Sequence, residues 1–361
     1  MEEGNLWDSK IFLTGPASKE LEWWIENIHQ IPPSSFLAPE AVLTIETDAS
    51  LTGWGAVCNG NTTSGPWSTE DVKECPHINS LELKAAFLAV KSFARQFQGV
   101  VKIRMDNKPA VAYINKLGGT KSYNLNAVAL KLWEFCLWRN LWPVAEYLFG
   151  KLNTTADRES RDFNDPSDWK LDPQIFNQLQ LWHYKAEIDL FANRNNFQLR
   201  RYYSWKPDPG AENIDAFSVC WTEKSLYAFP PFILIPRCLR QVTEQRATIL
   251  LIAPVWSNQP WYPQLLHMLV AKPILLPQHP NLLLNPSNAK HPLVVNRSLQ
   301  LAAWIVSMDQ SRQIKFQKEL KKSSEARFDQ IQSGPTPAHG NHLFAGVMEN
   351  IYIPFQSLFP M

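Results

Sequence analysis

The stretch AVLTIETDAS, residues 41–50, decides how the first half of the chain folds. Its Val, Leu, Ile and Thr residues are typical of a buried strand, and a turn that contains Gly53 follows it. We therefore expect the strand to end near Asp48, with this carboxylate at the edge of a sheet. An acid in this position is a candidate metal ligand, because Mg²⁺ prefers hard oxygen donors.

Three further acids occupy different local settings downstream of Asp48. Glu82 lies near the start of a strong helical pattern, Asp106 ends a second apolar strand, and Asp157 lies in the first turns of a later helix. Four carboxylates from four separate elements can hold a pair of divalent ions rigidly. The plainer alternative is that four acids among 34 mean nothing, and Glu82 alone could be a first-turn acid favoured by the helix dipole.

The order of apolar patterns predicts the fold that carries these acids. The expected elements are three short strands within residues 41–68, a helix at 78–97, a strand at 100–106, a helix at 122–140, a strand at 142–149 and a helix capped by Asn153. This order predicts an α/β fold with a mixed five-stranded sheet, helices on both faces and the acids at one edge.

The composition is that of a globular protein with a substantial core. Hydrophobic residues make up 45% and charged residues 19% of the 361 positions, and a chain of this length suits two domains. The net charge of +1 gives no global attraction to nucleic acid, so any basic groove must be local. One basic run suits phosphate contacts, although solvated surface is the better interpretation of any single lysine in it: Lys102, Arg104, Lys108, Lys116, Lys121 and Lys131.

Cysteine usage and hydropathy bear on the compartment. The five cysteines have no paired spacing, which indicates reduced thiols and a nuclear or cytoplasmic location. The acidic N-terminus shows no signal-peptide pattern, and no apolar run approaches the length of a membrane span. We therefore expect no membrane association.

The acids lie in four blocks of sequence, which are TDASLTGWGAV at 47–57, HINSLELKAA at 77–86, RMDNKPAVAYIN at 104–115 and NTTADRESR at 153–161. These blocks, in this order, resemble the catalytic motifs of the ribonuclease H domain in retroelement reverse transcriptases. More narrowly, they are similar to those of DIRS-type retrotransposons, the tyrosine-recombinase class. The resemblance places a ribonuclease H-like domain at residues 41–162. It implies hydrolysis of the RNA strand of RNA–DNA hybrids.

The same resemblance implies the roles of individual residues. The metal ligands would be Asp48, Glu82, Asp106 and Asp157, which would hold two Mg²⁺ ions or Mn²⁺ in their place. Asn79 would contact the minor groove of the hybrid, where the 2′-hydroxyl distinguishes RNA from DNA. The other candidate substrate-binding residues are Ser50, Asn107 and Lys108.

One loop departs from the family pattern. YLFGK at 147–151 stands where related elements carry His-Ile-Pro-Gly-Lys, so Tyr147 and Phe149 are substitutions. The histidine that cellular ribonucleases H have near the last acid is missing, and Lys151 lies in that region. This difference bears on product release more than on the chemistry.

The chain contains no Tyr-x-Asp-Asp polymerase signature. We therefore expect a fragment or a standalone derivative of a reverse transcriptase, with the polymerase part as a candidate partner. A catalytically silent, retroelement-derived protein that binds nucleic acid is the alternative function. The presence of all four acids favours the enzyme, whereas the altered loop and the missing polymerase favour the alternative.

Residues 174–308 are expected to form a second α/β domain after a linker at 163–173. The strings AEIDLFANRNN, RYYSWKPDPGAENIDAF, LYAFPPFILI and ATILLIAPVWSNQPWYPQLL resemble the methyltransferase-like domain of the same elements, which is similar to phage-type adenine-N6 DNA methyltransferases. Active enzymes begin the segment that matches 229–232 with Asn or Asp, but Phe229 cannot accept a hydrogen bond from an amino group. Asp189 matches the acid of the cofactor strand, but no glycine-rich loop accompanies it. We expect a degenerate domain that binds no S-adenosylmethionine.

The remaining segments carry weaker patterns. Residues 1–40 predict a lead-in helix and a linker, and residues 309–361 predict a flexible tail that is partly helical at most. Trp205, Trp221 and Trp256 are expected to pack in the core of the second domain or to face the first.

Overall fold

The computed structural model describes residues 12–30, 40–163, 165, 168–222, 224–286, 289–332, 344–348 and 351–358. The chain divides into two compact units, residues 1–40 and 41–361. In the first unit, α1 (Gly15–Asn27) continues into a 3₁₀ turn at Ile28–Gln30, where the sequence predicts a helix. The linker expected after this helix falls at residues 31–39, outside the described residues.

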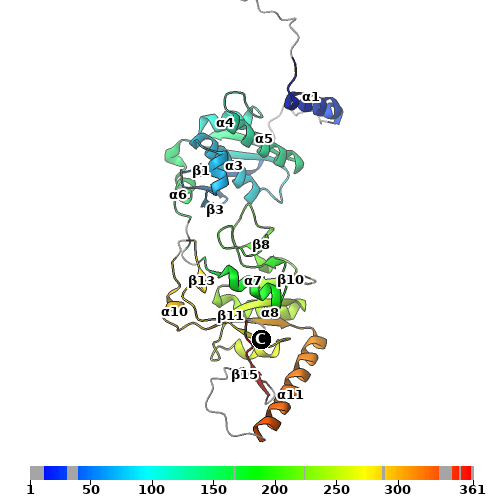
Figure 1. The fold of residues 1–361 in the computed structure, drawn as a ribbon. Coiled ribbons are helices and arrows are strands. Elements are labelled where there is room, and N and C mark those ends of the chain that lie inside the picture. Colours follow the sequence, from blue (N-terminus) through cyan, green and yellow to red (C-terminus); the bar gives the residue numbers. More distant parts are fainter. Residues whose placement is uncertain are drawn as a thin grey trace, which may run out of the picture. The chain divides into compact units, whose positions relative to one another are not determined.

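Five strands form a mixed sheet in the first part of the second unit (Figure 1). They are β1 (Ala41–Ala49), β2 (Gly53–Cys58), β3 (Asn61–Pro66), β4 (Gly99–Met105) and β5 (Leu141–Tyr147). Their order across the sheet is β3-β2-β1-β4-β5. β2 runs antiparallel to β1 and β3, whereas β4 runs parallel to β1 and β5 parallel to β4. The predicted mixed five-stranded sheet is confirmed.

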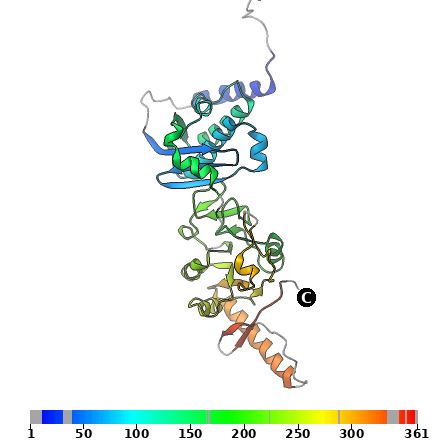
Figure 2. The ribbon, with the colours of Figure 1, turned by 90° about the vertical axis from the view of Figure 1, so that its left-hand side faces the viewer.

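Helices lie against both faces of this sheet, as predicted (Figures 1 and 2). They are α3 (Ile78–Phe93), α4 (Lys108–Asn115), α5 (Tyr123–Trp138) and α6 (Thr154–Arg161), and the short helix α2 (Thr69–Glu74) precedes α3. Trp54 and Ala56 of β2 are buried in the core that α3 shares, so Gly55 between them faces the opposite side. A Cβ added at Gly55 would collide with the backbone of Ala156 and Ser160. The missing side chain thus lets α6 approach β2 backbone to backbone.

The alternation along β1 decides which side chains enter the core. Leu43, Ile45 and Ala49 are buried with residues of α3 such as Leu83. Asp48 therefore points to the other face, where it stands opposite Gly55 in the pairing of β1 with β2. The strand pattern thus places the Asp48 carboxylate next to α6.

The helix predicted at 78–97 ends earlier in the structure. α3 stops at Phe93, and Phe97, which falls within the predicted helix, lies beyond it and is exposed. Gly99 takes a left-handed conformation with φ of 109° and begins β4. The chain must leave the helix before residue 97 to make this reversal.

A second α/β arrangement follows, built on a seven-stranded sheet with the order β12-β14-β11-β10-β7-β8-β9. Its strands are β7 (Ile188–Asp189), β8 (Arg201–Ser204), β9 (Asn213–Ile214), β10 (Ser225–Ala228), β11 (Thr248–Pro254), β12 (Ile274–Leu275) and β14 (Leu301–Ser307). Its helices are α7 (Pro173–Trp182), α8 (Ile235–Gln245), α9 (Tyr262–His267) and α10 (Pro292–Val295). β14 runs antiparallel to β11 and β12, and the pairs from β11 to β9 are parallel.

Part of the expected linker is a strand of this half of the molecule. β6 (Lys170–Leu171) pairs antiparallel with β13 (Leu283–Leu284). Leu171 is fully buried among apolar residues of the second half. The partner strand lies more than a hundred residues away, so the short stretch carried no local strand pattern.

The expected flexible tail is also folded where it is described. α11 (Gln310–Gln332) is followed by a hairpin of β15 (Phe344–Met348) and β16 (Ile351–Pro354). Phe316, Ala345 and Ile353 are buried in the core of the second half. The Tyr262 hydroxyl donates a hydrogen bond to the Ala345 carbonyl oxygen at 2.8 Å. A few apolar residues in a charged segment therefore suffice to anchor it.

The three tryptophans singled out in the second half have different environments. Trp221 is fully buried and Trp256 packs partly buried against the core. Trp205 is 74% exposed and does not pack in the core, so for this residue only the expectation that it faces the first domain stays a prediction. No helix in the described part of the chain combines the length and apolar character needed to cross a membrane.

Candidate functional site

Three of the predicted acids converge at one edge of the first sheet. Asp48 lies near the end of β1, Asp106 directly follows β4, and Glu82 comes from the second turn of α3. Each offers a carboxylate oxygen, and these oxygens all lie within 4.8 Å of one another. β1 and β4 are parallel neighbours, so their C-terminal ends meet at the same edge.

Two of the three acids, Asp48 and Glu82, are buried. The Glu82 Oε2 atom has no hydrogen-bond partner among the described residues. Burial, reinforced by the charges of Asp48 and Asp106, raises the pKa of Glu82 to about 9. A buried carboxylate oxygen without a partner is costly, whereas a divalent cation would satisfy it. The three acids therefore fit a metal site.

The pKa of the Asp48 carboxylate is raised less than that of Glu82. Burial raises its pKa to about 6, the hydrogen bond from Ser160 opposes the rise, and Asp106 adds to it. The Ser160 hydroxyl donates to Asp48 Oδ2 at 2.7 Å, which fixes the orientation of the carboxylate. Ser160 thereby couples α6 directly to the candidate metal site.

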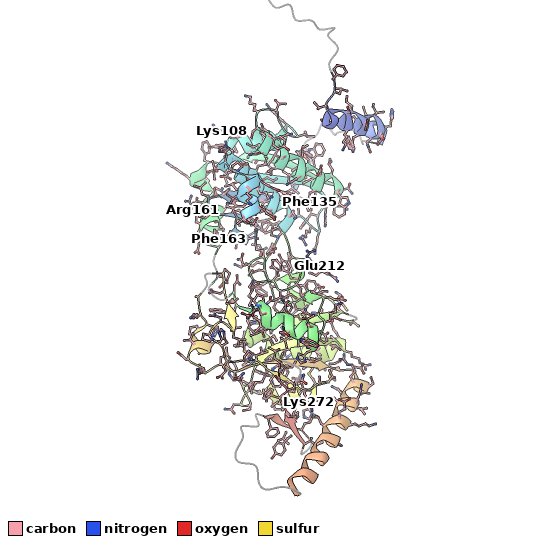
Figure 3. All side chains as sticks on the ribbon, viewed as in Figure 1. Lys108, Phe135, Arg161, Phe163, Glu212 and Lys272 are labelled. Carbon is pink, nitrogen blue, oxygen red and sulfur yellow. The ribbon has the colours of Figure 1, made fainter. Side chains whose placement is uncertain are left out.

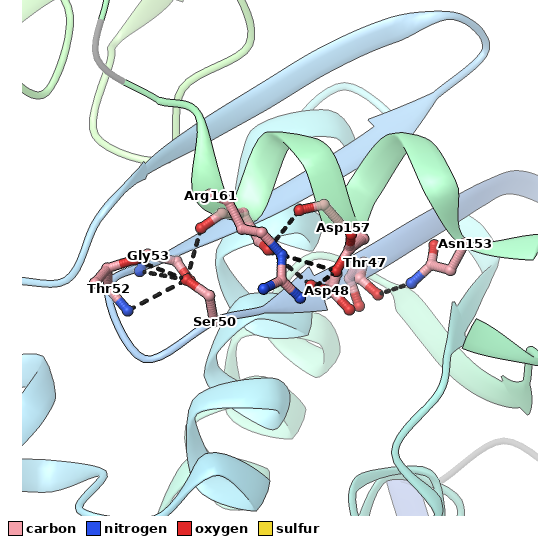
Figure 4. A network of polar contacts seen from close by, with 9 residues as sticks. Thr47, Asp48, Ser50, Thr52, Gly53, Asn153, Asp157 and Arg161 are labelled. Carbon is pink, nitrogen blue, oxygen red and sulfur yellow. Dashed lines mark hydrogen bonds and ion pairs between the residues drawn. The ribbon is translucent and has the colours of Figure 1, made fainter. Parts of the chain in front are cut away.

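The fourth predicted ligand, Asp157, lies on α6 outside the group of three. Its Oδ1 atom accepts hydrogen bonds from Arg161, at 2.5 Å from Nη2 and 3.0 Å from Nε (Figure 4). It is close enough to Asp48 for its charge to raise the pKa of that residue. The structure thus brings three of the four acids together and shows the fourth beside them, paired with an arginine.

The start of α6 is tied to β1 by Asn153. This residue was expected to cap the helix, but its side chain makes no capping hydrogen bond. Its Nδ2 group instead donates to the Thr47 carbonyl oxygen at 2.8 Å, next to Asp48 (Figure 4). Asn153 therefore fixes where α6, and with it Asp157, lies along β1.

Ser50 has its hydroxyl engaged inside the fold. It donates to the Ser160 carbonyl oxygen at 2.7 Å and accepts from the backbone N–H of Gly53 at 3.0 Å. These contacts close the turn after β1 and hold the end of α6 (Figure 4). Its position is thus explained by the fold, and a contact with substrate stays a prediction.

The candidates Asn79 and Asn107 bind each other beside the carboxylates. Asn107 Nδ2 donates to Asn79 Oδ1 at 2.9 Å, and Asn107 Oδ1 caps α4 by accepting from the Ala110 N–H. Asn79 precedes Glu82 by one helical turn, and Asn107 follows Asp106. The pair links the two elements that carry these acids, so it is placed to contact a strand bound there.

Three members of the basic run form ion pairs with glutamates. Lys102 and Arg104 both contact Glu146, with Lys102 Nζ 2.8 Å from its carboxylate. Lys131 Nζ lies 3.1 Å from Glu74. These three suit solvated ion pairs better than phosphate contacts. Lys108 is exposed at the start of α4 (Figure 3). Its Nζ atom lies 5.1 Å from the ring centre of Tyr147.

Two residues that orient the site were missed by the sequence interpretation. Ser160 and Arg161 follow Asp157 by three and four positions, so they share its face of α6. That spacing was readable in the block NTTADRESR. Their partners, Asp48 and Asp157, show that the last turn of this helix belongs to the site.

The comparisons with known proteins identify ribonucleases H among solved structures. No protein-family model and no curated protein matches the chain. The N-terminal ribonuclease H domain of a Mycobacterium tuberculosis protein, solved as a fusion with maltose binding protein, is 18% identical, with a TM-score of 0.28, and the match covers 33% of this chain and 91% of that one.

Two further solved structures match a similar share. Ribonuclease H1 from Halobacterium salinarum is 14% identical, with a TM-score of 0.26, and the match covers 32% of this chain and 92% of that one. LC11 ribonuclease H1, isolated from compost and solved in complex with an RNA/DNA hybrid, is 19% identical, with a TM-score of 0.27 and the same coverage. A functional assignment for this chain rests on the sheet and carboxylates described above.

Proposed function

We propose that residues 41–162 form a ribonuclease that hydrolyses the RNA strand of RNA–DNA hybrids with the help of divalent metal ions. The observation that carries this proposal is the convergence of Asp48, Glu82 and Asp106 within 4.8 Å, with Glu82 Oε2 left without a partner. Packing three acids so closely disfavours the charged forms unless a cation is shared. The site is therefore built for metal binding at the expense of metal-free stability.

Mg²⁺ suits these hard oxygen donors, and Mn²⁺ could replace it. A pair of such ions, when bound, supplies an activated water and stabilises the leaving oxygen of a phosphodiester. Asp48, near the end of the central strand and among the other acids, would be the main residue to hold the metal. Ser160 keeps its carboxylate in place. Glu82 of α3 and Asp106 after β4 would hold the metal as well, and Asp157, which Arg161 now binds, would be a further ligand.

Recognition of the RNA strand is assigned to the asparagine pair. Asn79 and Asn107 stand beside Glu82 and Asp106, and both carry amide groups that can meet a 2′-hydroxyl. Because Asn107 Oδ1 is used to cap α4, the contact to substrate falls mainly to Asn79. Lys108, exposed at the start of α4, suits a phosphate of the same strand.

Incubation of the purified chain with a labelled RNA–DNA hybrid and Mg²⁺ tests the function. We expect cleavage of the RNA strand only, no cleavage of double-stranded DNA, and complete loss of activity in EDTA. The catalytically silent alternative is favoured by the altered loop, by the missing polymerase signature and by the hydrogen bonds from Arg161 that occupy Asp157. Hybrid binding without cleavage at any Mg²⁺ or Mn²⁺ concentration would establish that alternative.

We further propose that the chain derives from a DIRS-type retrotransposon, acts in the nucleus or cytoplasm, and works beside the polymerase part of a reverse transcriptase. The second half would then be a methyltransferase-like domain without methyl transfer. Two observations support its inactivity. Both Asp189 carboxylate oxygens accept backbone N–H groups, from Phe191 and Gln198, and Asp189 is buried. Phe229 packs against the apolar core.

A further inference from the structure

The loop that departs from the family pattern exposes two aromatic rings. Tyr147 ends β5 and Phe149 follows two residues later, and they are 40% and 67% exposed. Their ring centres lie 5.3 Å apart in an edge-to-face arrangement. Neither ring belongs to the apolar core of the first domain. Aromatic side chains exposed next to each other are candidates for contact with a ligand or partner.

This loop lies directly beside the carboxylates. Tyr147 stands opposite Met105 in the pairing of β5 with β4, and the Leu148 N–H donates to the Met105 carbonyl oxygen at 2.8 Å. A Cβ added at Gly150 would lie 2.9 Å from Asp106 Oδ2. The two rings therefore lie at the same edge of the sheet as the carboxylates.

A cation completes the surface. Lys108 Nζ lies 5.1 Å from the ring centre of Tyr147, and Lys108 itself follows Asp106 by two positions. An aromatic pair beside a lysine suits a nucleotide, since the ring can stack on a base and the ammonium can contact its phosphate. A protein partner would not need the lysine, and it would have to share this edge with the strand bound at the carboxylates.

Base stacking in a hybrid decides which nucleotides could contact the two rings. Bases inside a duplex are stacked on both sides and offer no free face, whereas unpaired bases can be splayed out onto aromatic side chains. We propose that Tyr147, Phe149 and Lys108 bind an unpaired nucleotide of the RNA strand next to the carboxylates. The preferred substrate is then a hybrid that continues into single-stranded RNA. This inference rests on the proposed function, because it takes the RNA strand to lie at the acids.

Binding measurements on the full chain carrying Asp48→Asn test the inference without cleavage. Fluorescence anisotropy in Mg²⁺ would compare a blunt RNA–DNA hybrid with hybrids that carry a 5′ or a 3′ single-stranded RNA extension. We expect one extended hybrid to bind roughly 5- to 150-fold more tightly than the blunt one, the range of one stacked base. Adding Phe149→Ala should abolish most of this preference and leave the affinity for the blunt hybrid unchanged.

Two matched variants sharpen the test. Phe149→Trp keeps a stacking face and should keep the preference. Trp138→Ala removes a more exposed ring, at the end of α5 and thus at the opposite end of the sheet, and should change neither affinity. Equal affinities for blunt and extended hybrids, a preference that survives Phe149→Ala, or an equal loss for both hybrids would each overturn the inference. Failure of the parent chain to cleave hybrids would instead count against the proposed function alone.

Discussion

Arg161 binds Asp157 one turn earlier on α6, with its Nη2 atom 2.5 Å and its Nε atom 3.0 Å from Asp157 Oδ1. A guanidinium therefore stands where the fourth predicted metal ligand would meet its ion. The side chains are 65% and 45% exposed, and ion pairs in such surroundings contribute only about 0.2–1 kcal/mol. The pair is weak enough for a divalent ion to displace it.

Arg161→Ala should therefore strengthen metal binding. Without the guanidinium, a metal ion no longer has to displace Arg161 from Asp157. We therefore expect the Mn²⁺ affinity to rise about 1.5- to 5-fold. Calorimetric titration of the chain with Mn²⁺ in the absence of substrate measures this change. Arg158→Ala is the matched control, because Arg158 lies on the same helix and contacts Glu159 instead. Unchanged or weaker Mn²⁺ binding in Arg161→Ala would remove Asp157 from the metal site.

Asp48→Asn should abolish cleavage of the hybrid and preserve the fold. The substitution removes a charge from the centre of the site at nearly constant volume, and the Ser160 hydroxyl can still donate to the amide oxygen. We expect a loss of at least about 100-fold in the cleavage rate, in line with the removal of one electrostatic contributor from an active site. The rate and the thermal unfolding curve are measured on the same preparation. Parent-like cleavage by this variant would show that the site is misassigned.

Metal binding should strengthen as the pH rises from about 6 towards about 9. The pKa values of Asp48 and Glu82 are raised to about 6 and about 9, so protons compete with the metal throughout this window. In the metal-free protein the two groups favour folding at low pH, and that contribution is lost as the pH rises through these values. Added metal should restore it.

The metal-induced rise in melting temperature, measured at several pH values, checks this expectation. In Glu82→Gln, the metal-induced rise in melting temperature should depend less on pH near pH 9, because the group with the higher pKa is gone. A metal-induced rise that stays constant between pH 6 and pH 9 in the parent chain would contradict the proposed ligand roles.

The second half should bind no S-adenosylmethionine. Asp189 is buried and already bound by two backbone N–H groups, and Phe229 offers no acceptor to an amino group. Leaving an amine unpaired against a phenyl ring would disfavour the target base by about 1–3 kcal/mol. Calorimetry with S-adenosylmethionine, followed by a methyl-transfer assay on DNA, should show no signal. Tight binding together with labelled adenine would reverse the view of this half as inactive.

The strands of the first domain were predictable because their alternation is local. Ile45 and Ala49 pack against α3 while Asp48 faces α6, and this follows from the two-residue period of β1. The convergence of Asp48 and Asp106 also followed, since acids at the ends of neighbouring parallel strands meet at one edge. These features depend only on residues close in sequence and on the strand order.

The contacts that α6 makes could not be predicted from a local sequence pattern. Asn153 is well placed to cap its own helix, but it binds the Thr47 carbonyl more than a hundred residues away. The burial of Leu171 and Phe316 likewise depends on distant partners in the second half. The exposure of Trp205 has the converse cause, because an aromatic residue in a sequence does not by itself show whether the core has room for it.

Gly55→Ala should weaken both the fold and the activity, because it acts on the contact that positions α6. The added methyl group would lie 2.5 Å from the Ala156 carbonyl oxygen, and backbone atoms cannot turn away as a flexible side chain could. Overpacking of this kind costs about 1–3 kcal/mol, so the melting temperature of the first domain should fall. Gly15→Ala is the control, since an added Cβ there meets nothing within 4 Å.

The helix can relieve the collision only by moving away from β2. Such a shift would take Ser160 from Asp48 and displace Asp157, so cleavage should fall more than the loss of folded protein explains. Measuring the rate well below the melting temperature separates the two effects. Full activity in a folded Gly55→Ala protein would mean that the position of α6 does not matter for the chemistry, and Asp157 would then have no part in the site.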